Sequence, residues 1–162
     1  MGSRIIVVDD DSDYLELVRN RLQTAGFPEV VGLDDPIAAA ARCESNGEFD
    51  VALIDVGMPE LDGRELLEAI KRHSPWTECI MVTAVNDART AVECLRLGAY
   101  DYLVKPVSEE DLIFAVKRAL ERKRLLDILQ IERSRRPVVF EHPEAFREII
   151  TRSAPLMRLL KE

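Results

Sequence analysis

The sequence is poor in cysteine and histidine and contains no long apolar run. It has 3 Cys and 2 His, with no Cys-x-x-Cys pair and no zinc-site spacing. An odd number of free thiols favours a reducing compartment. The apolar start before Asp9 is too short for a signal peptide, and no run approaches the length of a membrane span. We therefore expect a cytoplasmic protein with no membrane contact.

Basic residues are fewer than acidic ones. The 22 Lys and Arg against 30 Asp and Glu give a formal net charge of −8. Such a chain has no general attraction for nucleic acid or anionic membrane. We interpret the basic clusters at 122–124 and 133–136 as a solvated helix face and a linker. With 47% apolar residues, the 162-residue chain can bury the core of one domain and carry an appended segment.

Four short apolar runs each end at a chemically reactive side chain. The runs have the composition of strands buried on both faces. Parallel strands present their carboxyl ends at one edge of the sheet, where open α/β sheets bind their ligands. The runs are 5–8, 51–54, 79–82 and 102–104, and they are followed by Asp9-Asp10, Asp55, Thr83 and Lys105.

Strand-like and helix-like segments alternate from residue 4 to about 120, with one more strand at 30–33. This alternation predicts an α/β fold, a doubly wound five-stranded parallel sheet with helices on both faces. In the flavodoxin-like order 2-1-3-4-5, Asp10 and Asp55 face each other across the crevice between the first and third strands. Capping patterns predict helix starts at Asp13 with Glu16, at Asp62 with Glu65 and at Ser108, and a further helix is expected from about Asp87 to Leu97.

The last helical pattern continues past the end of a compact domain. Leu112, Val116 and Ala119 form one apolar seam, and Leu125, Leu126, Ile128, Leu129 and Ile131 continue the spacing. An extended C-terminal helix of this length favours a two-stranded coiled coil, although a helix that folds back or frays is an alternative. We predict a globular domain over 4–120, a linker helix over 121–140 and a last segment over 141–162.

The expected cluster at the sheet edge suits phosphoryl chemistry. The carboxylates of Asp9, Asp10 and Asp55 repel one another unless a cation joins them. Oxygen ligands without His or Cys suit Mg²⁺, which is usually shared with phosphate oxygens. Thr83 can donate a hydrogen bond to a phosphoryl group and Lys105 can neutralise its charge. Asp55 is then the natural nucleophile.

Each of these residues also has a structural explanation when it is taken alone. Asp9 and Asp10 can belong to a solvated turn, Asp55 can be a cap, Thr83 a strand residue and Lys105 a surface lysine. The agreement of four separate strand ends favours the phosphoryl site.

These motifs resemble the receiver domain of bacterial two-component response regulators. They are IIVVDD at 5–10, LIDVGMPELDG at 53–63, MVTA at 81–84 and GAYDYLVKP at 98–106. The resemblance covers 4–120 and implies that Asp55 accepts a phosphoryl group from a histidine kinase. It also implies that Asp10, Asp55 and the Gly57 carbonyl bind Mg²⁺, that Asp9 acts through water, and that Thr83 and Lys105 contact the phosphoryl group.

The same resemblance implies a switch and a cis Lys105–Pro106 peptide. Thr83 would move toward the phosphate and the Tyr102 ring would follow inward, which reshapes the face made by the fourth helix, fifth strand and fifth helix. Gly57 and Val85 stand at positions that tune dephosphorylation in the family. Their lack of polar side chains indicates a longer-lived phosphoryl group.

The tail carries a second resemblance. FREIITRS at 146–153, with Met157 and Leu160, is similar to the opening of the AAA+ ATPase domain of sigma54-dependent, NtrC-type activators. This implies transcription regulation by a homodimer, with DNA and sigma54 polymerase bound through output domains. Because no phosphate loop or helix-turn-helix segment is present, we expect this chain alone neither to hydrolyse ATP nor to bind DNA.

Two other functions compete with a phosphoacceptor switch that is not an enzyme. A haloacid-dehalogenase-type phosphohydrolase also uses an aspartyl nucleophile, but it needs a second acid two residues later, where Gly57 stands. A receiver-like dimerisation module with unused phosphorylation is the other alternative, and the intact set of site residues argues against it.

Overall fold

A computed structural model of the chain describes residues 2–46 and 49–134. Strands and helices alternate as the apolar patterning predicts. The chain divides into two units, 1–128 and 129–162, and only the last turns of α5 are described in the second. The elements are β1 (Arg4–Val8), α1 (Ser12–Thr24), β2 (Glu29–Leu33), α2 (Pro36–Asn46), β3 (Val51–Ile54), α3 (Gly63–His73), β4 (Glu78–Thr83), α4 (Ala88–Arg96), β5 (Asp101–Val104) and α5 (Glu109–Ser134).

The strands form one parallel sheet in the order β2-β1-β3-β4-β5, which confirms the predicted fold class and topology. Val7 and Val8 of β1 lie opposite Leu53 and Ile54 of β3, so the two strands end side by side. Asp9 and Asp55, which follow these strands, therefore leave the sheet at neighbouring points.

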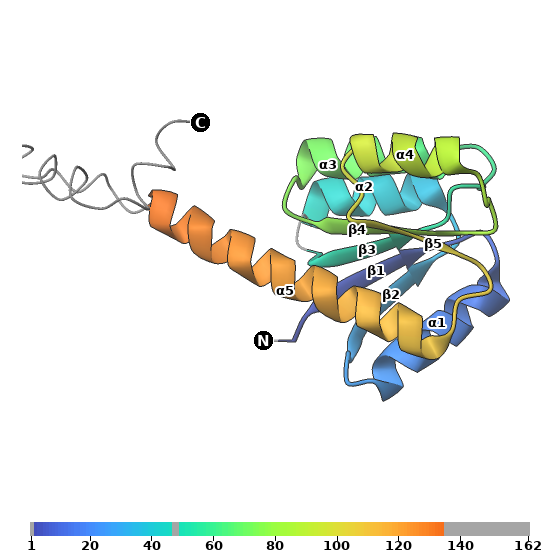
Figure 1. The fold of residues 1–162 in the computed structure, drawn as a ribbon, viewed down its shortest axis with the longest axis horizontal. Coiled ribbons are helices and arrows are strands. Elements are labelled where there is room, and N and C mark those ends of the chain that lie inside the picture. Colours follow the sequence, from blue (N-terminus) through green and yellow to red (C-terminus); the bar gives the residue numbers. More distant parts are fainter. Residues whose placement is uncertain (1, 47–48, 135–162) are drawn as a thin grey trace, which may run out of the picture. The chain divides into compact units, whose positions relative to one another are not determined.

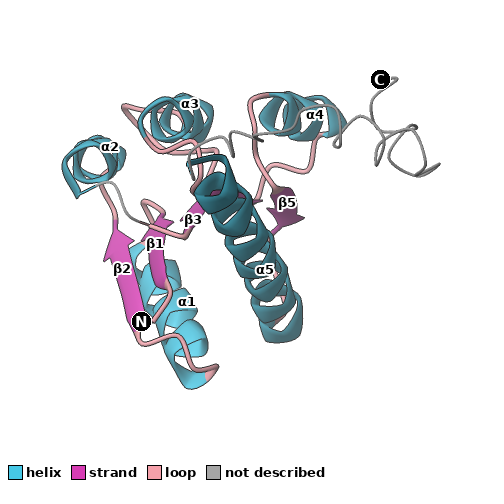
Figure 2. Ribbon diagram, turned by 90° about the vertical axis from the view of Figure 1, so that its left-hand side faces the viewer, coloured by secondary structure: helices cyan, strands magenta, loops and turns pink. Residues whose placement is uncertain are grey.

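Two apolar layers enclose the sheet, because side chains alternate between its faces along each strand. Figures 1 and 2 show α2, α3 and α4 over one face and α1 and α5 over the other. Ile6 and Val8 pack in the layer under α2 and α3, whereas Ile5 and Val7 pack in the layer that includes α1 and α5. The inner strands β1, β3 and β4 are buried, which explains why their sequences are almost continuously apolar. The expectation of burial on both faces is wrong for 102–104, because β5 is an edge strand and is only partly buried.

Carboxylates at the amino ends of three helices fix where these helices begin. Asp62 accepts a hydrogen bond from the Arg64 amide, as its capping pattern predicts, and Asp87 accepts from the amides of Arg89 and Thr90. The predicted cap of the first helix at Asp13 is wrong. Asp11 caps α1 instead, because its side chain accepts from the amides two and three residues later, and Asp13 lies in the first turn.

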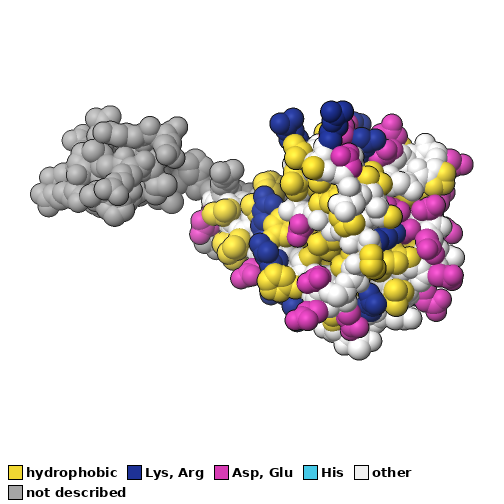
Figure 3. Space-filling model, turned by 45° about the vertical axis from the view of Figure 1, so that its right-hand side comes forward, with side chains coloured by type: hydrophobic (Ala, Val, Ile, Leu, Met, Phe, Trp, Pro, Cys, Tyr) yellow, Lys and Arg dark blue, Asp and Glu magenta, His cyan; other side chains and the backbone are white. Residues whose placement is uncertain are grey.

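The long C-terminal helix is confirmed, since α5 has 26 residues. Its seam of Leu112, Val116 and Ala119 is buried against the sheet, whereas Leu125 and Ile128 are 59% and 54% exposed. Apolar side chains also reach the surface among charged ones on the face drawn in Figure 3. Residues 135–140 of the predicted linker and the predicted 141–162 segment lie outside the described residues. Among the helices that the structure describes, none is long and apolar enough to cross a bilayer.

The basic cluster at 122–124 is more than a solvated helix face. Arg122 of α5 places a guanidinium nitrogen 3.4 Å from Oε2 of Glu78, the first residue of β4. The Glu78 side chain is only 3% exposed, so Arg122 neutralises a buried carboxylate. The same guanidinium lies 5.3 Å from the centre of the Tyr100 ring. Arg122 thus ties α5 to the beginning of β4.

Candidate functional site

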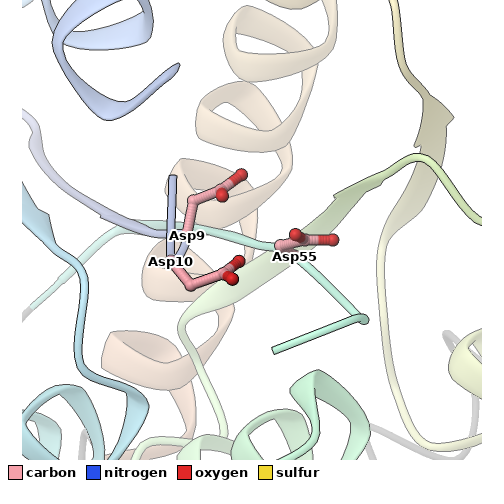
Figure 4. A group of neighbouring side chains, drawn as sticks. All are labelled: Asp9, Asp10 and Asp55. Carbon is pink, nitrogen blue, oxygen red and sulfur yellow. The ribbon is translucent and has the colours of Figure 1, made fainter. Parts of the chain in front are cut away.

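Three carboxylates converge at the carboxyl edge of the sheet. Asp9 and Asp10 follow β1 and Asp55 follows β3, and one oxygen from each lies within 4.8 Å of the others. Figure 4 shows the Asp9 and Asp10 side chains extending toward the same space as Asp55. Asp9 and Asp55 are buried, and Asp10 is exposed. The sequence prediction that these residues meet is therefore confirmed by the geometry.

The backbone hydrogen bonds of the sheet hold these residues in place. The Asp9 amide donates to the Leu33 carbonyl at 3.2 Å, and the Asp55 amide donates to the Val8 carbonyl at 3.0 Å. At the other side of the sheet, the Lys105 amide donates to the Thr83 carbonyl at 2.8 Å. The backbones of Asp9, Asp55 and Lys105 are thus each fixed by a neighbouring strand, so their side chains are held in place before any ligand binds.

Lys105 completes the cluster from β5. Its ammonium nitrogen lies 2.5 Å from Oδ2 of Asp9 and 3.6 Å from Oδ2 of Asp55. Burial alone would lower the pKa of Lys105, but the hydrogen bond to Asp9 and the charges of Asp55 and Asp9 together raise it. Lys105 therefore keeps its positive charge at neutral pH, beside the candidate phosphoryl acceptor.

Asp9 is buried, and burial disfavours the charged form of its carboxyl group. Burial raises the pKa of Asp9, although hydrogen bonds from Lys105 and from the Asp11 amide oppose the rise. A divalent cation in the cluster would favour the ionised form of this carboxyl group. The three acidic side chains offer only oxygen ligands, and the exposed position of Asp10 leaves room for water. The donor set therefore fits Mg²⁺, which prefers oxygen and keeps several of its waters.

Thr83 and Tyr102, the two predicted switch residues, both contact Val85. The Val85 amide donates to Oγ1 of Thr83 at 3.2 Å, and the Tyr102 hydroxyl donates to the Val85 carbonyl at 2.6 Å. Thr83 is buried at the end of β4, and Tyr102 is partly buried against the core. Val85, in the segment between β4 and α4, thus forms hydrogen bonds with the side-chain hydroxyls of both Thr83 and Tyr102.

The segment after β3 wraps closely around Asp55. The Gly57 amide donates to Oδ1 of Asp55 at 3.3 Å, and Gly57 is exposed. Gly63 begins α3 with its amide donating to the Val56 carbonyl at 3.0 Å. A Cβ atom at Gly63 would stand 2.0 Å from the Asp55 carbonyl oxygen, so only glycine fits there. The Lys105–Pro106 peptide is cis, as the resemblance implied.

The sequence interpretation missed one residue at the site. The motifs in the sequence give Tyr14 no role at the site, but its ring centre lies 4.0 Å from the Lys105 ammonium. The signal available in the sequence was its position in the first turn after the Asp9-Asp10-Asp11 run, where a helix starts at the sheet edge.

Comparisons with known proteins agree with this geometry. The family described as "Response regulator receiver domain" matches residues 5–117. Among solved structures, a CheY-like receiver domain protein from Methanospirillum hungatei JF-1 is 32% identical with a TM-score of 0.73, over 76% of this chain and 98% of that chain. A BeF3-activated DrrB receiver domain is 34% identical with a TM-score of 0.68, over 75% of this chain and 100% of that chain.

Curated relatives are longer regulatory proteins. The regulatory protein AtoC of Escherichia coli K12 is 33% identical over 129 residues, which are 74% of this chain and 25% of AtoC. The C4-dicarboxylate transport transcriptional regulatory protein DctD of Pseudomonas aeruginosa is 34% identical over 161 residues, 99% of this chain and 34% of DctD. The chain therefore spans about a quarter to a third of the length of these relatives.

Proposed function

Because the chain belongs to the family of response regulator receiver domains, we propose that it is the phosphorylated switch of a two-component system and that Asp55 is its acceptor. The observation that carries the proposal is the meeting of three carboxylates and one ammonium at a single sheet edge. The chain acts as a phosphoacceptor whose chemistry is confined to its own phosphorylation and dephosphorylation.

In the proposed reaction, one oxygen of the Asp55 carboxylate attacks the phosphorus of a phosphohistidine on the partner kinase. A phosphorus–oxygen bond forms while the phosphorus–nitrogen bond breaks, and the imidazole nitrogen keeps the electron pair of the broken bond. Under this proposal, Lys105, whose ammonium lies 3.6 Å from Oδ2 of Asp55, binds one phosphoryl oxygen, and the Thr83 hydroxyl donates a hydrogen bond to another.

Asp10, Asp55 and the Gly57 carbonyl are the proposed ligands of Mg²⁺, with Asp9 acting through a water. When bound, Mg²⁺ neutralises charge on the carboxylates and on the phosphoryl oxygens. The exposed position of Asp10 and the exposed, unhindered Gly57 support this assignment, because solvent and a phosphoryl group can reach both. Gly57 also argues against a haloacid-dehalogenase-type enzyme, since it supplies no acid to protonate a leaving group.

Removal of divalent metal should stop phosphorylation. We expect EDTA to suppress phosphoryl incorporation from acetyl phosphate, as followed by intact-mass spectrometry, and excess Mg²⁺ to restore it. Asp10→Asn should weaken Mg²⁺ binding at least about tenfold in calorimetric titration, because it removes one charged ligand. Asp13→Asn, an exposed change three residues away, is the control. Equal incorporation with and without metal would contradict the magnesium assignment.

Thr83 and Tyr102 are the proposed readers of the phosphoryl group. Because both contact Val85, a movement of the Thr83 hydroxyl toward the phosphate would change the segment that holds the Tyr102 hydroxyl. Tyr102 belongs to β5 and packs against the core cluster that includes Cys94 of α4, and the exposed side chains of Val92, Leu95 and Val104 lie on these two elements. This face of α4, β5 and α5 is therefore the proposed output surface.

The chain is proposed to serve a larger sigma54-dependent activator of transcription. Under this proposal, residues 4–120 are the receiver, 121–140 a linker helix and 141–162 the beginning of an AAA+ ATPase domain. The alignment with the DctD regulator covers 99% of the chain and so extends beyond the receiver match at 5–117, which supports a continuation of the same kind after the receiver. DNA and sigma54 polymerase would be bound by output domains, and a histidine kinase would be the phosphoryl donor.

We propose that the chain forms a homodimer through the exposed apolar side chains of α5. We expect Leu125→Gln with Ile128→Gln to weaken dimerisation at least about a hundredfold in sedimentation, because each buried aliphatic side chain contributes about 1.5 kcal/mol or more. Both changes leave Arg122 and its ion pair intact, which truncation after Leu120 would not.

Leu17→Gln, which alters an exposed leucine of α1, is the matched control for the dimer test. Loss of the dimer on Phe114→Gln, with the α5 double variant unaffected, would instead assign the interface to the α4, β5 and α5 face. An unchanged dimer in all three variants would reject both surfaces.

Phosphorylation at the proposed residue can be tested by peptide mapping. After reaction with acetyl phosphate and Mg²⁺, the labelled acyl phosphate should be found in the peptide that contains Asp55. Beryllofluoride with Mg²⁺ should bind the unlabelled protein and be excluded by prior phosphorylation. A label in the peptide of Asp9 and Asp10 alone would overturn the assignment of Asp55.

A further inference from the structure

We propose that Tyr14 is a positioning residue for Lys105, and that the face of its ring holds the ammonium in place for phosphoryl acceptance at Asp55. The inference rests on the proposed function for its role, but the contact itself is independent of phosphorylation. Tyr14 lies in the first turn of α1 and Lys105 follows β5, so the contact connects two elements that are far apart in the sequence.

The surroundings of the Lys105 ammonium show what the ring contributes. Oxygens of Asp9 and Asp55 lie 2.5 Å and 3.6 Å from the nitrogen, and the centre of the Tyr14 ring lies 4.0 Å away. A cation at this distance from a ring is attracted by the negative charge of the ring face. The Lys105 side chain is only 18% exposed, so water screens this attraction weakly.

Lysine needs such a support more than arginine does. Its ammonium is a point charge on a flexible four-carbon stem, so its position depends on what surrounds it. The hydrogen bond to Asp9 alone would restrain the ammonium in only one direction. The ring face restricts a second direction, and the two contacts together hold the nitrogen within reach of Asp55.

The hydroxyl of Tyr14 is not what makes the contact. It is buried without a hydrogen-bond partner among the described residues. Tyr14 also lines a cavity of about 10 Å³ with Asp9, Asp55 and Leu112, roughly the room that one water needs. Burial raises the pKa of Tyr14, so the phenol is neutral beside the carboxylates. Removal of this unpaired hydroxyl is therefore a mild change, whereas removal of the ring is not.

The test compares Tyr14→Phe, which keeps the ring, with Tyr14→Leu, which keeps only apolar bulk. We expect Tyr14→Phe to phosphorylate from acetyl phosphate within about twofold of the unaltered rate, and Tyr14→Leu to be between about threefold and thirtyfold slower. In NMR spectra of the unphosphorylated proteins, the ring should shift the Lys105 ε-methylene protons upfield. This shift should persist in Tyr14→Phe and be lost in Tyr14→Leu.

Tyr100→Leu is the matched control, because it removes a ring that faces Arg122, away from the site. Tyr14→Met replaces Tyr14→Leu if the leucine variant does not fold. A folded Tyr14→Leu or Tyr14→Met with the unaltered rate would overturn the proposal, and so would a Tyr14→Phe that is as slow as Tyr14→Leu. Unchanged Lys105 shifts in Tyr14→Leu would also overturn it, even if no protein in the series were phosphorylated.

Discussion

Asp55→Asn should abolish phosphoryl incorporation while the protein stays folded. The amide cannot act as the nucleophile, so the rate should fall at least about a thousandfold, to the background of the assay. The fold should tolerate the change, because Asn is nearly isosteric and removes one of three mutually repelling carboxylates. Intact-mass spectrometry measures the incorporation, and a thermal melt verifies folding.

Asp35→Asn is a matched control for this experiment. Asp35 is exposed, and its carboxylate accepts hydrogen bonds from the amides of Ile37 and Ala38 at the start of α2. Asparagine serves as well in such a cap, so both stability and incorporation should be unchanged. Equal incorporation in Asp55→Asn and in the unaltered protein would place the acceptor on another residue.

Gly63→Ala should destabilise the protein by about 3 kcal/mol and lower its melting temperature by roughly 10 °C. The reason is steric, because the added Cβ would stand 2.0 Å from the Asp55 carbonyl oxygen and 2.7 Å from Cα of Val56. Both neighbours are backbone atoms, so relief requires a shift of the segment that carries Asp55. Phosphoryl incorporation should fall together with stability, since the acceptor would move.

Gly57→Ala is the control for the steric argument. A Cβ atom added at Gly57 meets nothing within 4 Å, and the residue is exposed. We expect a melting temperature within about 2 °C of the unaltered protein, because surface changes of this kind have small effects. If Gly63→Ala melted as high as Gly57→Ala, the close packing of α3 on the Asp55 backbone would be refuted.

Much of the fold could be predicted from the sequence, because the spacing of apolar residues matches the side chains that the structure buries. The runs before Asp9, Asp55 and Thr83 are apolar on both faces, and this pattern favours a parallel sheet that helices cover on both sides. The start of the first helix was predicted wrongly, since Asp11 and Asp13 are equally suited to capping by residue type. Only the backbone conformation of Asp11, extended at φ −86° and ψ 102°, decides between them.

The sequence predicts which residues meet at the site, but it does not predict all of the contacts between them. Strand order brings Asp9, Asp55 and Lys105 together. The alternation of elements predicts a parallel sheet, whereas the order 2-1-3-4-5 is an assumption taken from the flavodoxin-like fold. The contact of Tyr14 with Lys105 depends on the rotation of α1 against the sheet, which a helical period alone does not fix. Val85, which the sequence indicated only as a position that tunes dephosphorylation, contacts both Thr83 and Tyr102 because of the path of one loop.

The ion pair between Glu78 and Arg122 connects the beginning of β4 to α5, while the other end of β4 lies at the carboxyl edge of the sheet. Its last residue, Thr83, belongs to the proposed phosphoryl site, and its first residue, Glu78, forms an ion pair with Arg122 of α5. Rotation of α5 that separated the pair would leave a buried carboxylate without its cation, at a cost of about 2–3 kcal/mol. A torque applied to α5 would therefore be resisted by a strand of 6 residues that ends at the proposed phosphoryl site.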